Sequence, residues 1–207
     1  MKSIRNHHKN FPIITVQEPY QHVDWVISNN SDVHVVKHRE WFTDYTPFRF
    51  ETTSILGGSM KVFGVGDVHL EVCTEQGQST LVLRNVLHCP SSTCNILGLA
   101  GMGEGYEMQL AGPDAFWLRH LQTRTVYLLD HVVLWKLLLV GQEKGQSSLS
   151  PAGMYYIQAS WPTSERDRFQ AQKVGAEQSV SAGAVQNHFE ESGAGQQGIK
   201  AAYTARA

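Results

Sequence analysis

Hydrophobic and polar residues alternate over short stretches between residues 23 and 140, in the pattern that β-strands produce. Each stretch is rich in β-branched and aromatic residues and is followed by a turn rich in glycine, asparagine or serine. The predicted strands are 23–27, 33–36, 48–55, 60–73, 79–88, 106–110, 115–121 and 125–129. Only short helical turns are predicted before residue 160. This pattern indicates an all-β fold, either a barrel or a sandwich.

The composition changes along the chain and divides it into four parts. These are an N-terminal arm at 1–22, a strand-rich domain at 23–140, a region with a linker, an extra strand and a short helix at 141–170, and a tail at 171–207. The extra strand is expected at 153–157 and the short helix at 164–170. The tail is mostly glycine, alanine, glutamine and serine. It cannot bury enough apolar surface to offset its ordering entropy, so we predict that it is disordered.

Charge, apolar runs and cysteine content exclude several classes of function. The formal net charge of −2 gives no overall field that would hold a polyanion, so we expect no nucleic-acid partner. The longest apolar run, 132–140, is shorter than the ~20 residues of a membrane span. No apolar stretch follows the basic N-terminus, as it would in a secretory signal. Three cysteines are too few for a disulfide framework, which predicts reduced thiols and a cytoplasmic location.

Several short motifs follow one another between residues 24 and 108. They are DWVISNNSDVH at 24–34, WFTDYTP at 41–47, GGS at 57–59, VFGVGDV at 62–68, LRNVLHCP at 83–90, CNILG at 94–98 and GYEM at 105–108. In this order and spacing they resemble the protease region of copia-type retrotransposon polyproteins. The resemblance covers residues 23–130 and implies a retropepsin-like closed β-barrel, here followed by a C-terminal extension.

The resemblance also implies where the site residues lie. The active-site turn comprises Ser28, Asn29, Asn30, Ser31 and His34. The flap carries Gly57, Gly58 and Ser59, and a second apolar-glycine motif comprises Ile96, Leu97 and Gly98. Members of the family dimerise, and each chain supplies one half of the catalytic site.

The turn departs from the family pattern at the position of the catalytic aspartate. Where the family has Asp-Ser-Gly, this chain has Ser28, Asn29 and Asn30, a change that also resembles a set of fungal proteins with the same barrel. Aspartic proteolysis needs two carboxylates that share one proton around a water, and a serine pair cannot replace them. Asp24 and Asp32 lie four residues away, about 13 Å along an extended strand. We therefore expect no catalytic residue in this turn and no proteolysis.

Other catalytic and metal-binding patterns are weaker. His88, Cys89 and Cys94 lack the close Cys-x-x-Cys spacing and the fourth ligand of a zinc site, so we expect no metal, and the cysteines are expected to pack as small apolar residues. The glycine pair at 64 and 66 has no third glycine and no following helix, which argues against a nucleotide site. A nucleophilic Ser28–His34 pair lacks a third group. We expect no cofactor.

Three hypotheses remain for the barrel. It is a co-opted, non-catalytic binding or assembly module for a peptide, working as a homodimer. Alternatively, it binds a small apolar molecule such as a metabolite and assists a biosynthetic cyclisation, or it is a residual aspartic-type peptidase. The aromatic residues expected to line a pocket are Trp25, Trp41, Phe63 and Trp117.

Overall fold

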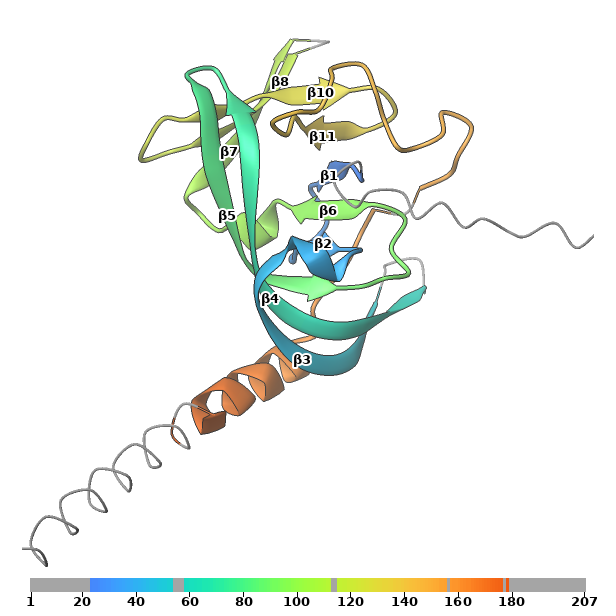
Figure 1. Cartoon of the computed structure of the whole chain (residues 1–207), viewed down its shortest axis with the longest axis vertical. Coiled ribbons are helices and arrows are strands. Elements are labelled where there is room, and N and C mark those ends of the chain that lie inside the picture. The colour runs from blue at the N-terminus through green and yellow to red at the C-terminus, as the bar shows by residue number, and fades with distance from the viewer. Residues whose placement is uncertain (1–22, 54–57, 113–114, 156, 177, 179–207) are drawn as a thin grey trace, which may run out of the picture.

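The computed structural model describes residues 23–53, 58–112, 115–155, 157–176 and 178 (Figure 1). Within them, 11 strands form one curled sheet, which confirms the predicted all-β barrel fold. The strands are β1 (Trp25–Ser28), β2 (Val35–Val36), β3 (Phe42–Thr53), β4 (Ser59–Thr74), β5 (Gly77–His88), β6 (Asn95–Gly98), β7 (Tyr106–Gly112), β8 (Ala115–His120), β9 (Val126–Tyr127), β10 (Leu129–His131) and β11 (Trp135–Leu137). Two 3-10 turns, η2 (Arg39–Trp41) and η3 (Ala100–Met102), lie between strands, and residues 163–176 are helical.

β1 lies inside the sheet, between β11 and β6. It runs parallel to β6, so that Ser28 at the end of β1 pairs with Gly98 at the end of β6. Every residue of both strands is buried, as is usual for parallel strands covered on both faces. This pairing brings the turn after β1 and the apolar-glycine motif of β6 to the same end of the sheet.

The glycine pair in β4 lets β3 approach β4 closely. Both strands curve strongly in Figure 1, and two register shifts interrupt their antiparallel pairing. A Cβ atom on Gly66 would lie 1.9 Å from the carbonyl oxygen of Asp44, and one on Gly64 would lie 2.2 Å from the ring of Tyr45. A side chain does not fit at Gly66, where the neighbour is backbone, and at Gly64 it would displace the ring of Tyr45. The pair therefore serves strand packing.

Two clusters of buried hydrophobic residues form the core. The first includes Trp25, Leu70 and Leu97. The second includes Trp161 and Phe169, which belong to the chain beyond the barrel. The C-terminal extension is thus packed into the same structure as the sheet.

The extension differs from its predicted form. Residues 153–155 are not in a strand, and residue 156 lies outside the described residues. The helix covers 163–176 and so includes the first residues of the predicted disordered tail, whereas 179–207 and the arm at 1–22 lie outside the described residues. Phe169 anchors the helix, because its ring is buried against Phe48 at 5.1 Å and Trp161 at 5.6 Å between ring centroids. No helix in the described part of the chain is long and apolar enough to cross a membrane.

A buried ion pair joins Asp24, just before β1, to Lys136 on β11, and its further hydrogen bonds reach the chain that follows the barrel. Lys136 Nζ donates to Asp24 Oδ1 at 2.8 Å, and both side chains are almost fully buried. Lys136 also donates to the carbonyl oxygen of Gln146. The second carboxylate oxygen of Asp24 accepts from Ser147 Oγ at 2.5 Å and from the backbone N–H of Ser148 at 3.0 Å. Each charge therefore has partners, as buried charges require.

Candidate functional site

The turn after β1 is buried. Ser28, the residue at the end of β1, is 3% exposed. Its hydroxyl lies 3.0 Å from that of Ser31, which donates to it. A Cβ atom on Gly98 would lie 2.3 Å from the carbonyl oxygen of Val33, so the turn presses directly on the end of β6. The structure thus brings together the predicted turn and the predicted apolar-glycine motif.

The C-terminal extension covers this turn. Ser31 Oγ accepts the backbone N–H of Ala159 at 2.9 Å and lies 3.2 Å from the carbonyl oxygen of Ile157. The side-chain amide of Gln158 donates to the carbonyl oxygen of Asn30 at 3.1 Å. We call residues 157–161 the covering segment.

Asp32 holds the other end of the covering segment. Its Oδ1 accepts the backbone N–H of Trp161 at 2.9 Å, and its Oδ2 lies 3.3 Å from Ser160 Oγ. Arg166, on the helix, reaches the same Oδ2 at 3.5 Å. Asp24 is engaged equally fully by Lys136. Both aspartates near the turn in sequence are therefore committed to structural contacts.

His34 does not serve Ser28 as a base. Its side chain is 2% exposed and lies against Gly101. Burial lowers the pKa of His34 to about 4, and a hydrogen bond to the backbone of Gly101 opposes this only in part. The imidazole is therefore uncharged at neutral pH, and its Nδ1 is buried with no hydrogen-bond partner among the described residues. The predicted His34 is a buried contact between the turn and η3.

The lowered pKa of His34 predicts that stability falls in mild acid. Below pH 6.5 the unfolded chain takes up a proton at this position, whereas the folded protein does so only near pH 4. Protonation of the unfolded state therefore favours unfolding, by about 2 kcal/mol at pH 5 relative to pH 8. Urea unfolding at the two pH values, in the natural chain and in His34→Phe, measures this. We expect the variant to lose about 2 kcal/mol less than the natural chain, and equal losses would contradict the assignment.

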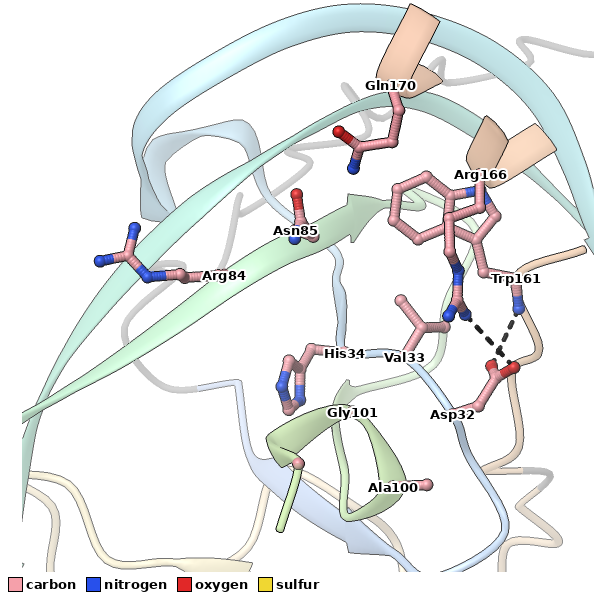
Figure 2. A pocket seen from close by; sticks show the side chains of 11 residues that line it. Asp32, Val33, His34, Arg84, Asn85, Ala100, Gly101, Trp161, Arg166 and Gln170 are labelled. Atoms are coloured by element: carbon pink, nitrogen blue, oxygen red, sulfur yellow. Dashed lines mark hydrogen bonds and ion pairs between the residues drawn. The ribbon is translucent and has the colours of Figure 1, made fainter. Parts of the chain in front are cut away.

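A cavity of about 190 Å³ opens beside the turn (Figure 2). It is lined by Asp32, Val33, His34, Arg84, Asn85, Ala100, Gly101, Gly103, Trp161, Arg166 and Gln170. Figure 2 shows Arg84 and Asn85 on β5, Arg166 and Gln170 on the helix, and Ala100 and Gly101 on η3. Together with residues 32–34, which follow the turn, four separate parts of the chain meet around this space.

Two arginines are among the lining residues, and Figure 2 shows their guanidinium groups directed apart. Arg84 forms one ion pair, with Asp67 at 3.1 Å, and its side chain remains 75% exposed. The guanidinium carbon of Arg166 lies 5.4 Å from the centre of a Trp161 ring, in addition to the contact with Asp32. Asn85 adopts a left-handed backbone with φ of 55°, fixed by a bond from its N–H to Asp67 Oδ1 at 3.1 Å. The backbone here is held in a rare conformation by a specific partner.

The aromatic residues expected to line a pocket are spread over the fold. Trp25 is fully buried and meets Trp41 edge to face at 5.7 Å. Phe63 is 40% exposed, and Trp117 lies under the guanidinium of Arg119. None of the four lines the cavity in Figure 2. Of the flap residues, Gly58 is exposed and Ser59 begins β4, while Gly57 lies outside the described residues.

His88, Cys89 and Cys94 do not form a metal site. The Nδ1 atom of His88 is hydrogen-bonded to the hydroxyl of Tyr45 at 2.9 Å. Both cysteines are unpaired and belong to the second core cluster, and burial raises the pKa of each thiol to about 12. The expectation that the cysteines pack as apolar residues is confirmed. Within the described ranges, no group of three or more histidine, cysteine or acidic side chains is placed to hold a metal ion.

Several residues of the cavity carried no recognisable signal in the sequence. Arg84 and Asn85 belong to a strand, and Arg166 lies on a helix next to acidic residues with which it could equally pair. Arg168 does pair with Glu165, but Arg166 pairs with Asp32, 134 residues earlier. Such a contact depends on the tertiary fold, so no pattern in the sequence near either residue predicts it.

Comparison with known families supports the barrel. Residues 25–105 match the family model described as Pol polyprotein, beta-barrel domain. The match spans β1 to β6 and η3, and therefore contains the turn and the apolar-glycine motif. It supports a retrotransposon polyprotein region in this part of the chain. Comparisons with curated proteins and with solved structures found no match.

Proposed function

We propose that this chain is a non-catalytic binding or assembly module built on a degenerate copia-type protease barrel. The observation that carries the proposal is the turn itself. The serine that the resemblance aligns with the catalytic aspartate is buried, and the covering segment lies over it. A barrel in this state retains strands and a neighbouring cavity but has no carboxylate pair to activate water.

A peptide partner suits the cavity better than an apolar metabolite. Cavities that bind drug-sized molecules are usually about 300–1,000 Å³ and mostly apolar. The cavity beside the turn measures about 190 Å³ and is lined by two arginines, an aspartate and two amides. Its size and polarity fit one side chain or chain end of a peptide. The metabolite hypothesis has no comparable support from the described residues.

The homodimer implied by the resemblance is a separate question. A retropepsin dimer would bring two turns together, and here the covering segment lies on that turn within the same chain. We therefore expect that any dimer uses another face or first releases the segment. Light scattering decides between a particle of 23.1 kDa and one of twice that mass.

Three parts of the proposal rest on the sequence alone. They are the copia-type ancestry, the fungal origin and the cytoplasmic location. If the ancestry is correct, the host has co-opted a barrel that derives from a retrotransposon. Sequencing the genes beside this one tests the ancestry, because flanking retroelement fragments would support a relic and biosynthetic enzymes would favour the metabolite hypothesis.

Two measurements test the proposed function. The full chain is incubated with an unfolded protein from acid to neutral pH, with and without a pepstatin-type inhibitor, and we expect no cleavage. A random peptide library is then displayed and selected against the full chain, and we expect peptides that bind with micromolar affinity. Inhibitor-sensitive cleavage, or a selection that yields no binder, would overturn the proposal.

Ser28→Asp is expected to remain inactive. The new carboxylate would be buried beside Ser31 and beneath the covering segment, so neither water nor a second carboxylate could reach it. We also expect lower stability, because a buried unpaired carboxylate is unfavourable. Ser28→Ala is the matched control, and cleavage of an unfolded protein is the readout. Cleavage by the aspartate variant alone would show that the turn is accessible.

A further inference from the structure

We infer that the open edge of β7 binds an extended peptide segment as an added antiparallel strand, and that this segment carries a lysine or arginine between two apolar residues. The inference rests on the proposed binding function and adds the surface that receives the main chain of the peptide. β7 lies at one end of the strand order, and among the described residues it pairs with β8 alone. Its other side is therefore a row of backbone groups that only another extended chain can match.

The two other edges of the described sheet are protected. β10, at the opposite end of the strand order, has only three residues. β3 pairs with β4 alone among the described strands, but it contains Pro47, which has no N–H to donate. The carbonyl oxygen of Arg49 in β3 also accepts a bond from Arg168 of the helix at 2.8 Å. Short length, proline and a covering element are common protections of edge strands, and β7 has seven residues and no proline.

The hydrogen bonds around β8 show which residues of β7 face the open edge. The N–H of Leu121 donates to the carbonyl oxygen of Gly105 at 2.8 Å, one residue outside the pair that Tyr106 forms with His120. This bond identifies Tyr106 and His120 as a non-hydrogen-bonded pair. The N–H of His120 accordingly donates to Thr125, on the other side of β8, at 2.9 Å.

Hydrogen-bonded and non-hydrogen-bonded pairs alternate along an antiparallel ladder. Glu107, which pairs with Arg119, therefore directs its backbone N–H and C=O toward β8. Tyr106 and Met108 direct theirs toward the open edge. An added strand would exchange hydrogen bonds with these two residues and would leave the bonds between β7 and β8 intact.

The side chains of β7 define the chemistry of the added strand. Tyr106 and Met108 are partly buried and pack against the first core cluster. Peptide residues opposite them would lie on the same face of the sheet, so apolar side chains there would extend the cluster. The peptide residue between them would lie on the opposite face, beside Glu107.

The carboxylate of Glu107 favours a cation at that position. Arg119 contacts its Oε1, whereas its Oε2 has no partner among the described residues, and the side chain is 37% exposed. The peptide residue opposite Glu107 would form a non-hydrogen-bonded pair, the arrangement in which cross-strand side chains are closest. A second copy of β7 would bring no cation, because glutamate is the one charged residue of this strand. Charge therefore favours a peptide with a lysine or arginine over a second copy.

Hydrogen exchange of the ¹⁵N-labelled full chain at low concentration tests the open edge before any ligand is added. We expect the amides of Tyr106 and Met108 to exchange at least tenfold faster than that of Glu107, which is bonded to β8. An acetylated and amidated peptide of sequence Thr-Val-Lys-Val-Thr is then added. We expect saturable protection of the Tyr106 and Met108 amides.

Two matched peptides separate main-chain pairing from charge. The same peptide with both valine nitrogens methylated cannot donate to the carbonyl groups of Tyr106 and Met108, and we expect it to bind at least tenfold more weakly. Thr-Val-Glu-Val-Thr places a like charge beside Glu107, and we expect it to bind about fivefold more weakly.

Variants of β7 locate the binding. Met108→Pro removes an N–H that β8 does not use, and an edge strand tolerates proline at such a position. Met108→Ala is the matched control, because it shortens the same side chain but keeps the N–H. We expect the proline variant to bind the lysine peptide about tenfold more weakly than the alanine variant does.

Glu107→Gln is expected to abolish the preference for the lysine peptide over the glutamate peptide. Glu71→Gln is its matched control, because Glu71 is an exposed glutamate on β4, which has partners on both sides. We expect this control to keep the preference of the natural chain. The same spectra show whether each variant is folded.

The outcomes separate this inference from the proposed function. The inference fails if Tyr106 is as protected as Glu107 in the dilute free chain, if protection rises with chain concentration alone, which would assign the edge to a second copy, or if the methylated peptide binds equally well. Selected peptides that bind without protecting Tyr106 and Met108 would leave the proposed function standing. Inhibitor-sensitive cleavage of a peptide that does protect them would overturn the proposed function and leave the inference standing.

Discussion

Replacing Lys136 with methionine is expected to lower the free energy of unfolding by about 3–5 kcal/mol at neutral pH. The change removes the cation that contacts Asp24 at 2.8 Å and leaves a buried carboxylate with only the Ser147 hydroxyl and the Ser148 N–H as partners. A buried charge without its counter-ion is among the most destabilising single changes in a protein. Urea unfolding followed by tryptophan fluorescence measures the loss.

The double variant Asp24→Asn with Lys136→Met tests the reason for that loss. Asparagine keeps an oxygen that accepts from Ser147 and Ser148 but carries no charge. We expect the double variant to recover at least half of the stability that the single variant loses. A single variant within about 1 kcal/mol of the natural chain would show that the carboxylate reaches water and that the pair is not truly buried.

Phe169→Ala is expected to lower stability by about 3–5 kcal/mol, the usual loss for a buried phenylalanine. The ring is 0% exposed and packs on Phe48 and Trp161, so its removal leaves a cavity between the helix and β3. Because this contact holds the helix, we expect residues 157–176 to open first. Hydrogen exchange should increase in this segment before it increases in the barrel.

Val174→Ala is the matched control for the helix. Val174 lies on the same helix but is half exposed, and its truncation is expected to change stability by less than about 0.5 kcal/mol. Trypsin cleavage after Arg166 and Arg168 gives a second readout, since both bonds lie in the docked helix. Equal cleavage rates in the two variants would mean that Phe169 does not anchor the helix.

The barrel could be predicted because each of its strands and turns is indicated by a short, continuous stretch of the sequence. Alternating residues such as those of β4, and turns such as the one before Gly77, define strands one at a time. The order of short motifs then indicated the fold family, and the parallel pairing of Ser28 with Gly98 places two of these motifs together. Position 98 must be glycine because the backbone of the turn lies against it and leaves no room for a side chain. A glycine at the end of an apolar motif is a local signal that the sequence can provide.

The candidate site could not be predicted because its contacts join distant parts of the chain. Trp161 lies in the core, but its position at the cavity depends on Asp32, 129 residues earlier. The segment at 153–157 reads as a strand from its aromatic and β-branched residues. Ala159 and Trp161 instead give their backbone donors to side chains of the turn, so no neighbouring strand is needed.

The covering of the turn has a consequence for how this chain could regain hydrolytic chemistry. The hydroxyl of Ser31 and the carbonyl of Ile157 that it faces are encoded 126 residues apart. A carboxylate introduced at the end of β1 would still be covered by residues 157–161. A deletion of the covering segment would expose the turn, but the turn would then lack a carboxylate. Each step alone yields a less stable protein without a new activity, so two separate genetic events would have to coincide before selection could act on the result.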